Sequence, residues 1–85
     1  MTMNLQEKVY LLQELEQLIA RLDIELRYEH LVDASSGLCT YKGKRCLLLE
    51  IDMDIDSKLI LLKSVLNAYD LSHMFISPMV RDFLG

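Results

Sequence analysis

The stretch RCLLLEIDM, residues 45–53, places a hydrophobic side chain at every second position from Leu47 to Met53. Alternation with a period of two is typical of a strand that buries one face. Residues 24–30 show the same rhythm, with hydrophobic and charged residues in turn. A short third segment lies between these two and is bounded by turn residues. The pattern predicts a three-stranded antiparallel sheet, with strands near 24–30, 38–42 and 45–53.

Before the predicted sheet, the hydrophobic residues have helical spacing. From Leu5 to Leu22 they recur at intervals of three and four, while the opposite positions carry mainly Gln and Glu. This stripe is typical of an amphipathic helix. Asn4 precedes it and can accept a hydrogen bond from a free N–H of the first turn. We therefore expect a long N-terminal helix.

After the sheet, two further helices are expected. Asp54 or Asp56 is placed to cap a helix near 55–69. Ser77 and Pro78 have the side chains preferred at the start of a helix, which should run near 78–84. The chain is thus predicted to be a single α+β domain over residues 1–85, in the order helix, sheet, two helices.

The turn between the second and third strands decides which side chains share a face. A two-residue turn at Gly43-Lys44 would be of type II′, with Gly at its first position. The face opposite the core would then carry Cys39, Tyr41, Cys46 and Leu48. A three-residue turn would instead place the two cysteines on opposite faces, because a slip of one residue reverses every side chain.

Composition points to a surplus of hydrophobic side chains. The chain has 85 residues, of which 52% are hydrophobic, and leucine alone occurs eighteen times. A domain of this size buries only about 60% of the surface that its unfolded chain exposes. A contiguous exposed apolar patch usually marks a partner, and a second copy is the commonest one. The candidate interface residues are Leu11 and Leu18 of the first helix and Tyr41 and Leu48 of the sheet.

The charge balance argues against nucleic acid as a partner. The net charge is −4, and the densest basic run is the short group Lys42, Lys44 and Arg45. Proteins that bind phosphate backbones need larger basic clusters. We expect no membrane span either, because the apolar run from Leu59 to Leu66 is interrupted by Lys63 and is too short to cross a bilayer.

The location in the cell follows from the N-terminus and the cysteines. Residues 1–10 carry Glu7 and Lys8 where a secretory signal would need an apolar stretch. Two cysteines without such a signal are expected to be reduced thiols, so we predict a cytoplasmic protein.

Metal ligands of the types that zinc prefers are present but not in the usual spacing. His30, Cys39, Cys46 and His73 supply two histidines and two cysteines. Structural zinc sites usually bring cysteines in pairs with two residues between them, whereas six residues lie between these two. The alternative is that the cysteines are small buried hydrophobic residues.

The acidic run Asp52, Asp54 and Asp56 is a second candidate cation site, together with Glu50. As a calcium loop it lacks the glycine and the bidentate glutamate, because Ser57 and Lys63 occupy those positions. Carboxylates at the start of a helix also complement its dipole without any ion.

No catalytic constellation is recognisable. Ser35, Ser36 and Cys39 are nucleophiles by residue type alone, and no G-x-S-x-G motif surrounds them. The three glycines are scattered, so they form no phosphate-binding loop. We expect no catalytic residues and no cofactor.

Several short motifs resemble a group of small uncharacterised bacterial proteins. The matching features span nearly the whole chain: IELRYE at 24–29, SGLC at 36–39, GK at 43–44, the acidic strand end at 50–54 and P-x-V-R-D-F-L at 78–84. The resemblance implies the fold and no activity. The order of strand, hairpin and helix is also similar to the start of some zinc metallopeptidases, but residues 57–68 lack the H-E-x-x-H motif of their helix.

The sequence thus favours a non-enzymatic interaction module that forms a homodimer. The alternative is a small metal- or ligand-binding protein that uses the Cys39 and Cys46 face or the strand end at Glu50, Asp52 and Asp54. A third hypothesis is an enzyme whose site is completed across a dimer interface.

Overall fold

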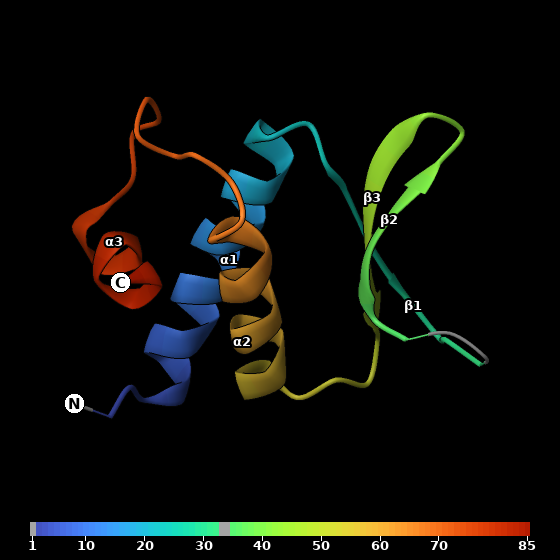
Figure 1. Cartoon of the computed structure of the whole chain (residues 1–85). Helices are drawn as coiled ribbons and strands as arrows, with labels where there is room; N and C mark the ends of the chain where they lie inside the picture. The colour runs from blue at the N-terminus through green and yellow to red at the C-terminus, as the bar shows by residue number, and fades with distance from the viewer. Residues whose placement is uncertain (1, 33–34) are drawn as a thin grey trace.

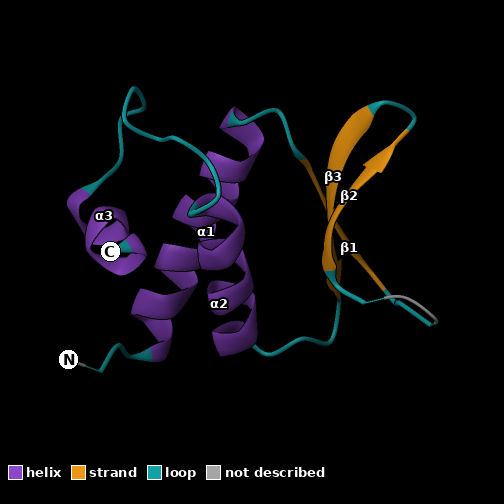
Figure 2. Cartoon of the chain, in the orientation of Figure 1, coloured by secondary structure: helices purple, strands orange, loops and turns teal. Residues whose placement is uncertain are grey.

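The computed structural model describes residues 2–32 and 35–85 and has the predicted α+β architecture (Figure 1). The helices gather on one side and the sheet forms a separate layer beside them (Figure 2). Helices α1 and α2 lie between the sheet and the short α3. The elements are α1 (Leu5–Arg21), β1 (Glu25–Glu29), β2 (Gly37–Tyr41), β3 (Lys44–Glu50), α2 (Ile55–Leu66) and α3 (Pro78–Leu84).

Helix α1 begins and ends where its sequence predicts. The Asn4 side chain accepts a hydrogen bond from the Glu7 N–H at 2.8 Å, and the Glu7 carboxylate accepts one from the Asn4 N–H at 3.2 Å. This capping box satisfies two N–H groups at the helix start. After the last turn, Asp23 adopts a φ of 61°, a left-handed conformation that Asp tolerates better than most residues and that stops the helix.

The sheet is mixed, so the prediction of three antiparallel strands was wrong. Its strand order is β1-β3-β2. Strand β3 pairs antiparallel with β2 and parallel with β1, with Leu26 beside Leu47. The chain reverses direction at each connection in either arrangement. The parallel pair arises because β3, and not β2, lies next to β1.

The hydrophobicity of β3 explains its central place. Leu47 and Leu49 face the helices and are completely buried, while Cys46 on the opposite face is only 3% exposed. A strand that is apolar on both faces is stabilised most when a neighbouring strand lies on each side of it. Only β2 and β3 follow the simpler rule that strands adjacent in sequence pair with each other.

The hairpin turn lies one residue earlier than predicted. Tyr41 pairs with Lys44, so the two turn residues are Lys42 and Gly43. Both have positive φ, 53° and 79°, which is typical of a type I′ turn and not of the predicted type II′ turn. Cys39 therefore lies directly opposite Cys46. The expectation that the cysteines share a face with Tyr41 and Leu48 agrees with this register.

The third strand is shorter than predicted. It ends at Glu50, and Ile51 and Asp52 form a turn before α2. Ile51, expected in the core, is 46% exposed because the alternating pattern continues beyond the last strand pair. Helix α2 likewise ends at Leu66, and the expected residues up to 69 form a turn.

One hydrophobic core joins the helices to the inner face of the sheet. Its members are buried residues from every helix, from β3 and from the residue before β1. The Lys8 ammonium and the Asp56 carboxylate are 2.8 Å apart and link the starts of α1 and α2 at the surface. The buried core consists of Leu11, Leu15, Leu18, Ile19, Ile24, Leu47, Leu49, Leu59, Leu62, Leu66, Val80 and Leu84.

Within the described residues, none of the helices has the length and apolar character needed to cross a membrane.

Candidate functional site

The parallel pairing of β1 and β3 brings together side chains that are far apart in sequence. Glu29 and Glu50 are register partners at the carboxyl ends of the two strands. His30 follows β1 directly, and Asp52 follows β3 by two residues. Because parallel strands end at the same edge of a sheet, these side chains meet there. We name His30, Glu50 and Asp52 the strand-end cluster.

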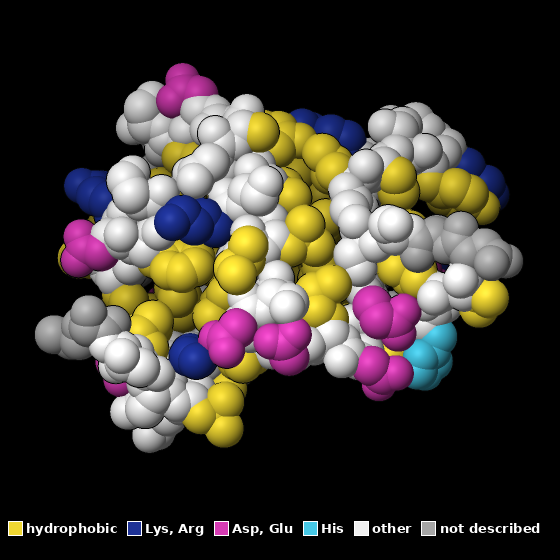
Figure 3. Space-filling view, turned by 60° about the horizontal axis from the view of Figure 1, so that its bottom comes forward, with side chains coloured by type: hydrophobic (Ala, Val, Ile, Leu, Met, Phe, Trp, Pro, Cys, Tyr) yellow, Lys and Arg dark blue, Asp and Glu magenta, His cyan; other side chains and the backbone are white. Residues whose placement is uncertain are grey.

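The distances within the strand-end cluster are short. His30 Nδ1 lies 3.5 Å from Glu50 Oε1 and 3.7 Å from Asp52 Oδ2. One potential ligand atom from each of the three residues lies within 4.8 Å of the others. His30 and Asp52 are mostly exposed, whereas Glu50 is half-buried. In Figure 3, a histidine lies against acidic side chains at the sheet end of the molecule.

Glu50 is held in place by the main chain. The N–H of Leu31 donates a hydrogen bond of 2.7 Å to Glu50 Oε2. This bond is the main reason why the pKa of Glu50 is lowered, and His30 contributes in the same direction. Glu50 thus offers a fixed carboxylate, and its second oxygen faces His30.

An imidazole nitrogen with two carboxylate oxygens is a ligand set that several divalent metals accept. Zinc, manganese and iron(II) all use such nitrogen and oxygen donors. A metal held by three protein ligands keeps positions for water or another ligand. Among residues 2–32 and 35–85, this is where three metal-ligating side chains come together.

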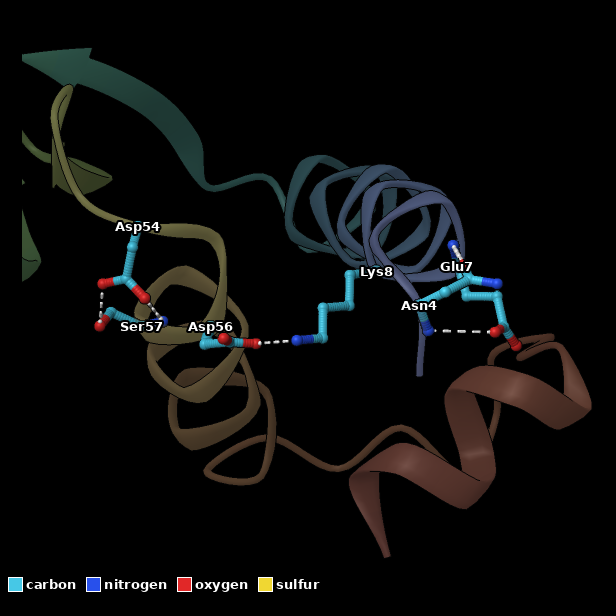
Figure 4. Close-up of polar contacts among 6 residues, drawn as sticks. All are labelled: Asn4, Glu7, Lys8, Asp54, Asp56 and Ser57. Carbon is cyan, nitrogen blue, oxygen red and sulfur yellow. Dashed lines mark hydrogen bonds and ion pairs between the residues drawn. The ribbon is translucent and has the colours of Figure 1, made fainter. Parts of the chain in front are cut away.

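Asp54 does not join the cluster, although the sequence made it a metal candidate. Its carboxylate accepts hydrogen bonds from the Ser57 hydroxyl at 2.6 Å and the Ser57 N–H at 3.3 Å, and so caps α2 (Figure 4). The Ser57 hydroxyl is the main cause of the lowered pKa of Asp54. Asp56 is turned to Lys8 in the same view. Asp54 and Asp56 are therefore explained by their positions at the start of α2, without a bound ion.

The two cysteines form a separate pair on the outer face of the sheet. Cys39 is exposed and Cys46 is buried, and both are free thiols. Burial, followed by the proximity of Cys39, raises the pKa of Cys46 and favours its protonated form. A protonated thiol is a poor metal ligand. The register brings the cysteines together, but no histidine of the described chain completes a metal cluster with them.

His73 lies apart from all the other candidate ligands. It belongs to the segment between α2 and α3, on the helical side of the molecule. Its charged neighbour there is Asp70, whose pKa is lowered mainly by the Ser72 N–H. The four residues that the sequence proposed for zinc therefore do not converge.

The interface candidates divide into buried and exposed residues. Leu11 is completely buried and Leu18 is 4% exposed, so neither has surface with which to contact a second chain. The hydrophobic side of α1 that carries them packs against the sheet, α2 and α3 of the same chain. On the outer sheet face, Tyr41 is 58% exposed and Leu48 is half-buried. The expectation of a helix interface at Leu11 and Leu18 therefore does not hold in this fold.

Several large hydrophobic side chains besides Tyr41 are exposed. A band of hydrophobic side chains crosses the face shown in Figure 3. The helical stripe already contained Leu5 and Val9, but only the structure shows that both lie on an exposed side of α1, together with Tyr10. In the described part of the chain, the large hydrophobic side chains that remain exposed are Leu5, Val9, Tyr10, Val32, Leu38, Tyr41, Ile51, Ile60 and Phe75.

A hollow of about 430 Å³ lies on the helical side, between the end of α2 and the C-terminus. Aliphatic side chains and Tyr69 form much of its wall, and Arg81 and Asn67 supply polar groups. It contains none of the predicted metal ligands and lies away from the strand-end cluster. This hollow could not be predicted from the hydrophobic pattern, because much of its wall comes from the irregular segment between α2 and α3.

No protein-family model matches the chain, and neither a curated protein nor a solved structure was found to be similar to it. The resemblances to small bacterial proteins and to metallopeptidases stay predictions.

Proposed function

We propose that this protein is a small non-enzymatic interaction module that self-associates. The observation that supports the proposal is the hydrophobic surface left outside the core. Nine large hydrophobic side chains of the described residues are between 41% and 89% exposed. For a chain of 85 residues this is a substantial surplus, and exposed apolar surface usually marks a site of association.

The sheet contributes to this surplus through its uncovered side. The helices pack on the face that carries Leu47 and Leu49, and the other face carries Cys39, Tyr41 and Leu48. In Figure 1 the turn of the β2–β3 hairpin also bends away from the helices. Partner binding would remove this apolar surface from water, which is favourable by roughly 25 cal/mol per Å².

The test is the mass of the untagged protein in solution across a dilution series. Light scattering after gel filtration and native mass spectrometry should both give the mass of two chains at high concentration and a shift toward one chain on dilution. The same series with a chelator is the control for a metal-bridged dimer. A single-chain mass at every concentration would contradict the proposal.

A second candidate function is divalent-cation binding at the strand-end cluster. The observation in its favour is the convergence of His30, Glu50 and Asp52 from two different strand ends. The carboxylates also give this end of the sheet a negative potential that attracts cations. The site would hold the ion by one nitrogen and two oxygen ligands.

Calorimetric titration of the chelator-treated protein with Zn²⁺ and with Mn²⁺ tests this function. Binding with one ion per chain is expected, and Asp52→Asn should abolish it or weaken it strongly. Cys39→Ser is the matched control and should bind as the unmodified protein does. Equal binding by the Asp52 variant, or lost binding in the Cys39 variant, would exclude the strand-end cluster as the site.

A further inference from the structure

The edge of the sheet at β2 has the features of a strand that pairs with another chain. In the part of the chain that the structure describes, β2 has β3 on one side and no strand on the other. Every residue from Leu38 to Tyr41 is exposed. A free edge presents unpaired N–H and C=O groups that can template a further strand.

The hydrogen-bond pattern identifies which groups of β2 point outward. The pair Tyr41 and Lys44 flanks a two-residue turn and therefore exchanges hydrogen bonds, as does every second pair after it. At the far end, the Glu50 N–H donates to Ser36 Oγ on the β2 side. This agrees with the alternation, since Glu50 follows Lys44 by six residues. The main-chain groups of Leu38 and Thr40 consequently face away from β3.

Charge distinguishes the two edges of the sheet. Strand β1 carries Glu25, Arg27 and Glu29, whereas residues 37–41 of β2 carry no charge. If two β1 strands paired antiparallel about Arg27, every second rung would place like charges opposite each other, with Arg27 opposite Arg27 and Glu25 opposite Glu29, which is destabilising. Two β2 strands meet without such repulsion.

We propose that two copies of this chain pair antiparallel along β2, about a two-fold axis at Cys39, and form one six-stranded sheet. Leu38 of each copy then lies opposite Thr40 of the other, and each such pair exchanges both of its N–H···O bonds. Cys39 meets Cys39 of the second copy in the close pair without hydrogen bonds. The inference rests on the proposed self-association and specifies its surface.

The side chains of this register are complementary in size. Tyr41 lies opposite Gly37 of the second copy, so that each exposed ring covers a position without a side chain. Among the described residues other than Gly37 and its chain neighbours, no atom lies within 4 Å of the place where a Cβ of Gly37 would be, so they leave the space beside it open. Aromatic residues paired across strands with glycine in this way cover exposed main chain and support the register.

Thr40→Pro is the principal test. Proline lacks an N–H but is tolerated at an edge where that N–H faces solvent. The variant should therefore keep the fold of the monomer, as judged by circular dichroism and thermal unfolding. It should raise the dimer Kd by roughly tenfold or more, because half of the intermolecular hydrogen bonds are lost. Leu38→Lys is a second variant with the same expected loss, in case the proline disturbs the strand.

Leu5→Lys is the matched control, because Leu5 is an exposed leucine on α1, away from the sheet. Its Kd should equal that of the unmodified protein. A dimer that Leu5→Lys dissociates and that Thr40→Pro and Leu38→Lys leave intact would overturn the β2 interface while self-association stands. A protein that is a monomer at all concentrations would overturn the proposed function as well.

Cross-linking at Cys39 tests the register. In a Cys46→Ala background, a small-molecule disulfide should join the Cys39 sulfurs of two copies and leave as two thiols. Opposite residues in a close pair have Cα atoms about 4.5 Å apart, within disulfide range, whereas a two-residue shift separates them by about 7–8 Å. Rapid formation of a covalent dimer is expected, with Cys39→Ser as the negative control. A non-covalent dimer that does not cross-link would overturn the axis at Cys39.

Discussion

Strands β2 and β3 are joined by a two-residue turn and have similar shares of hydrophobic residues, yet their surroundings differ. Leu47 and Leu49 of β3 are completely buried, while Leu38 of β2 is 45% exposed although it faces the same side of the sheet as Leu47. Strand β3 has a neighbour on each side, and β2 lies at the edge. Burial here follows from position in the sheet, and residue type alone does not determine it.

The two strands contribute to the protein in different ways. The central strand supplies stability, because its side chains meet the helices on one face and its main chain is paired on both sides. The edge strand supplies surface, because its leucine, cysteine and tyrosine side chains are exposed. Substitutions matched between the two strands should separate these contributions.

The largest difference is expected for leucine truncation. Leu49→Ala should lower the free energy of unfolding by about 2–5 kcal/mol, because a fully buried leucine leaves a cavity in the core. Leu38→Ala should lower it by less than about 1 kcal/mol. Urea unfolding of both variants, each at a concentration where the protein is monomeric, measures the difference. Similar losses would mean that β2 is as well packed as β3.

A smaller difference in the free energy of unfolding is expected between serine variants of the two cysteines. Cys46→Ser puts a hydroxyl group at a position that is 3% exposed, which should cost roughly 1–3 kcal/mol of unfolding free energy. Cys39→Ser, on the same rung but exposed, should change it by no more than about 0.5 kcal/mol. Thermal unfolding under reducing conditions is the measurement. The comparison fails if the Cys39 variant is the less stable one.

The smallest effect concerns pH at the end of β3. The pKa of Glu50 is lowered, first by the Leu31 N–H, so its stabilising contribution is present above the unfolded pKa of about 4.3. It is lost as the pH falls through the lower folded value. The difference in urea midpoint between the unmodified protein and Glu50→Gln should therefore shrink between pH 6 and pH 3.

Glu29→Gln is the control, since Glu29 shares the rung with Glu50 but its carboxylate lies beside Arg27, at 3.3 Å. It measures, over the same pH range, how the urea midpoint responds when a carboxylate at this strand end is removed that the main chain does not hold. A difference that is independent of pH in the Glu50 variant would mean that its carboxylate is not held by the main chain in solution.

The helices could be predicted from sequence because their signals are local. Each helix start is determined by residues that lie close together in sequence. These are Asn4 and Glu7 for α1, Asp54 and Ser57 for α2, and Ser77 and Pro78 for α3. The hydrophobic spacing of α1 also predicted a buried face, although not which part of it would stay exposed. Which residues of the stripe stay exposed depends on where the other elements pack on α1, and Leu5 and Val9 lie outside those contacts.

The order of the strands could not be read in the same way. Nothing in residues 24–30 indicates whether the partner is the next strand or the one after it, since both arrangements bury Leu26 and Tyr28. The strand-end cluster depends on this choice. In the predicted antiparallel sheet, His30 and Glu50 would not have met through parallel strand ends, and Asp52 would have remained part of an acidic run.

The hairpin turn shows a limit of another kind. Lys42 and Gly43 both adopt positive φ, and the sequence rule that places glycine at the first turn position selected the wrong pair. A type II′ turn favours glycine at its first position, whereas a type I′ turn favours it at its second position. A single glycine therefore fits two turns whose positions differ by one residue. The observed register differs from the predicted one by two residues, since Cys39 pairs with Cys46 and not with Leu48. A shift of two keeps both cysteines on one face and makes them direct cross-strand neighbours.

The strand order also bears on the kinetics of folding. Cys39 and Cys46 are seven residues apart, whereas Leu26 and Leu47, which pair across β1 and β3, are separated by 21. Closing the longer loop costs more chain entropy, and contacts that are distant in sequence slow folding. We therefore expect the hairpin to assemble early and β1 to dock late, along an edge of β3 that stays open until then.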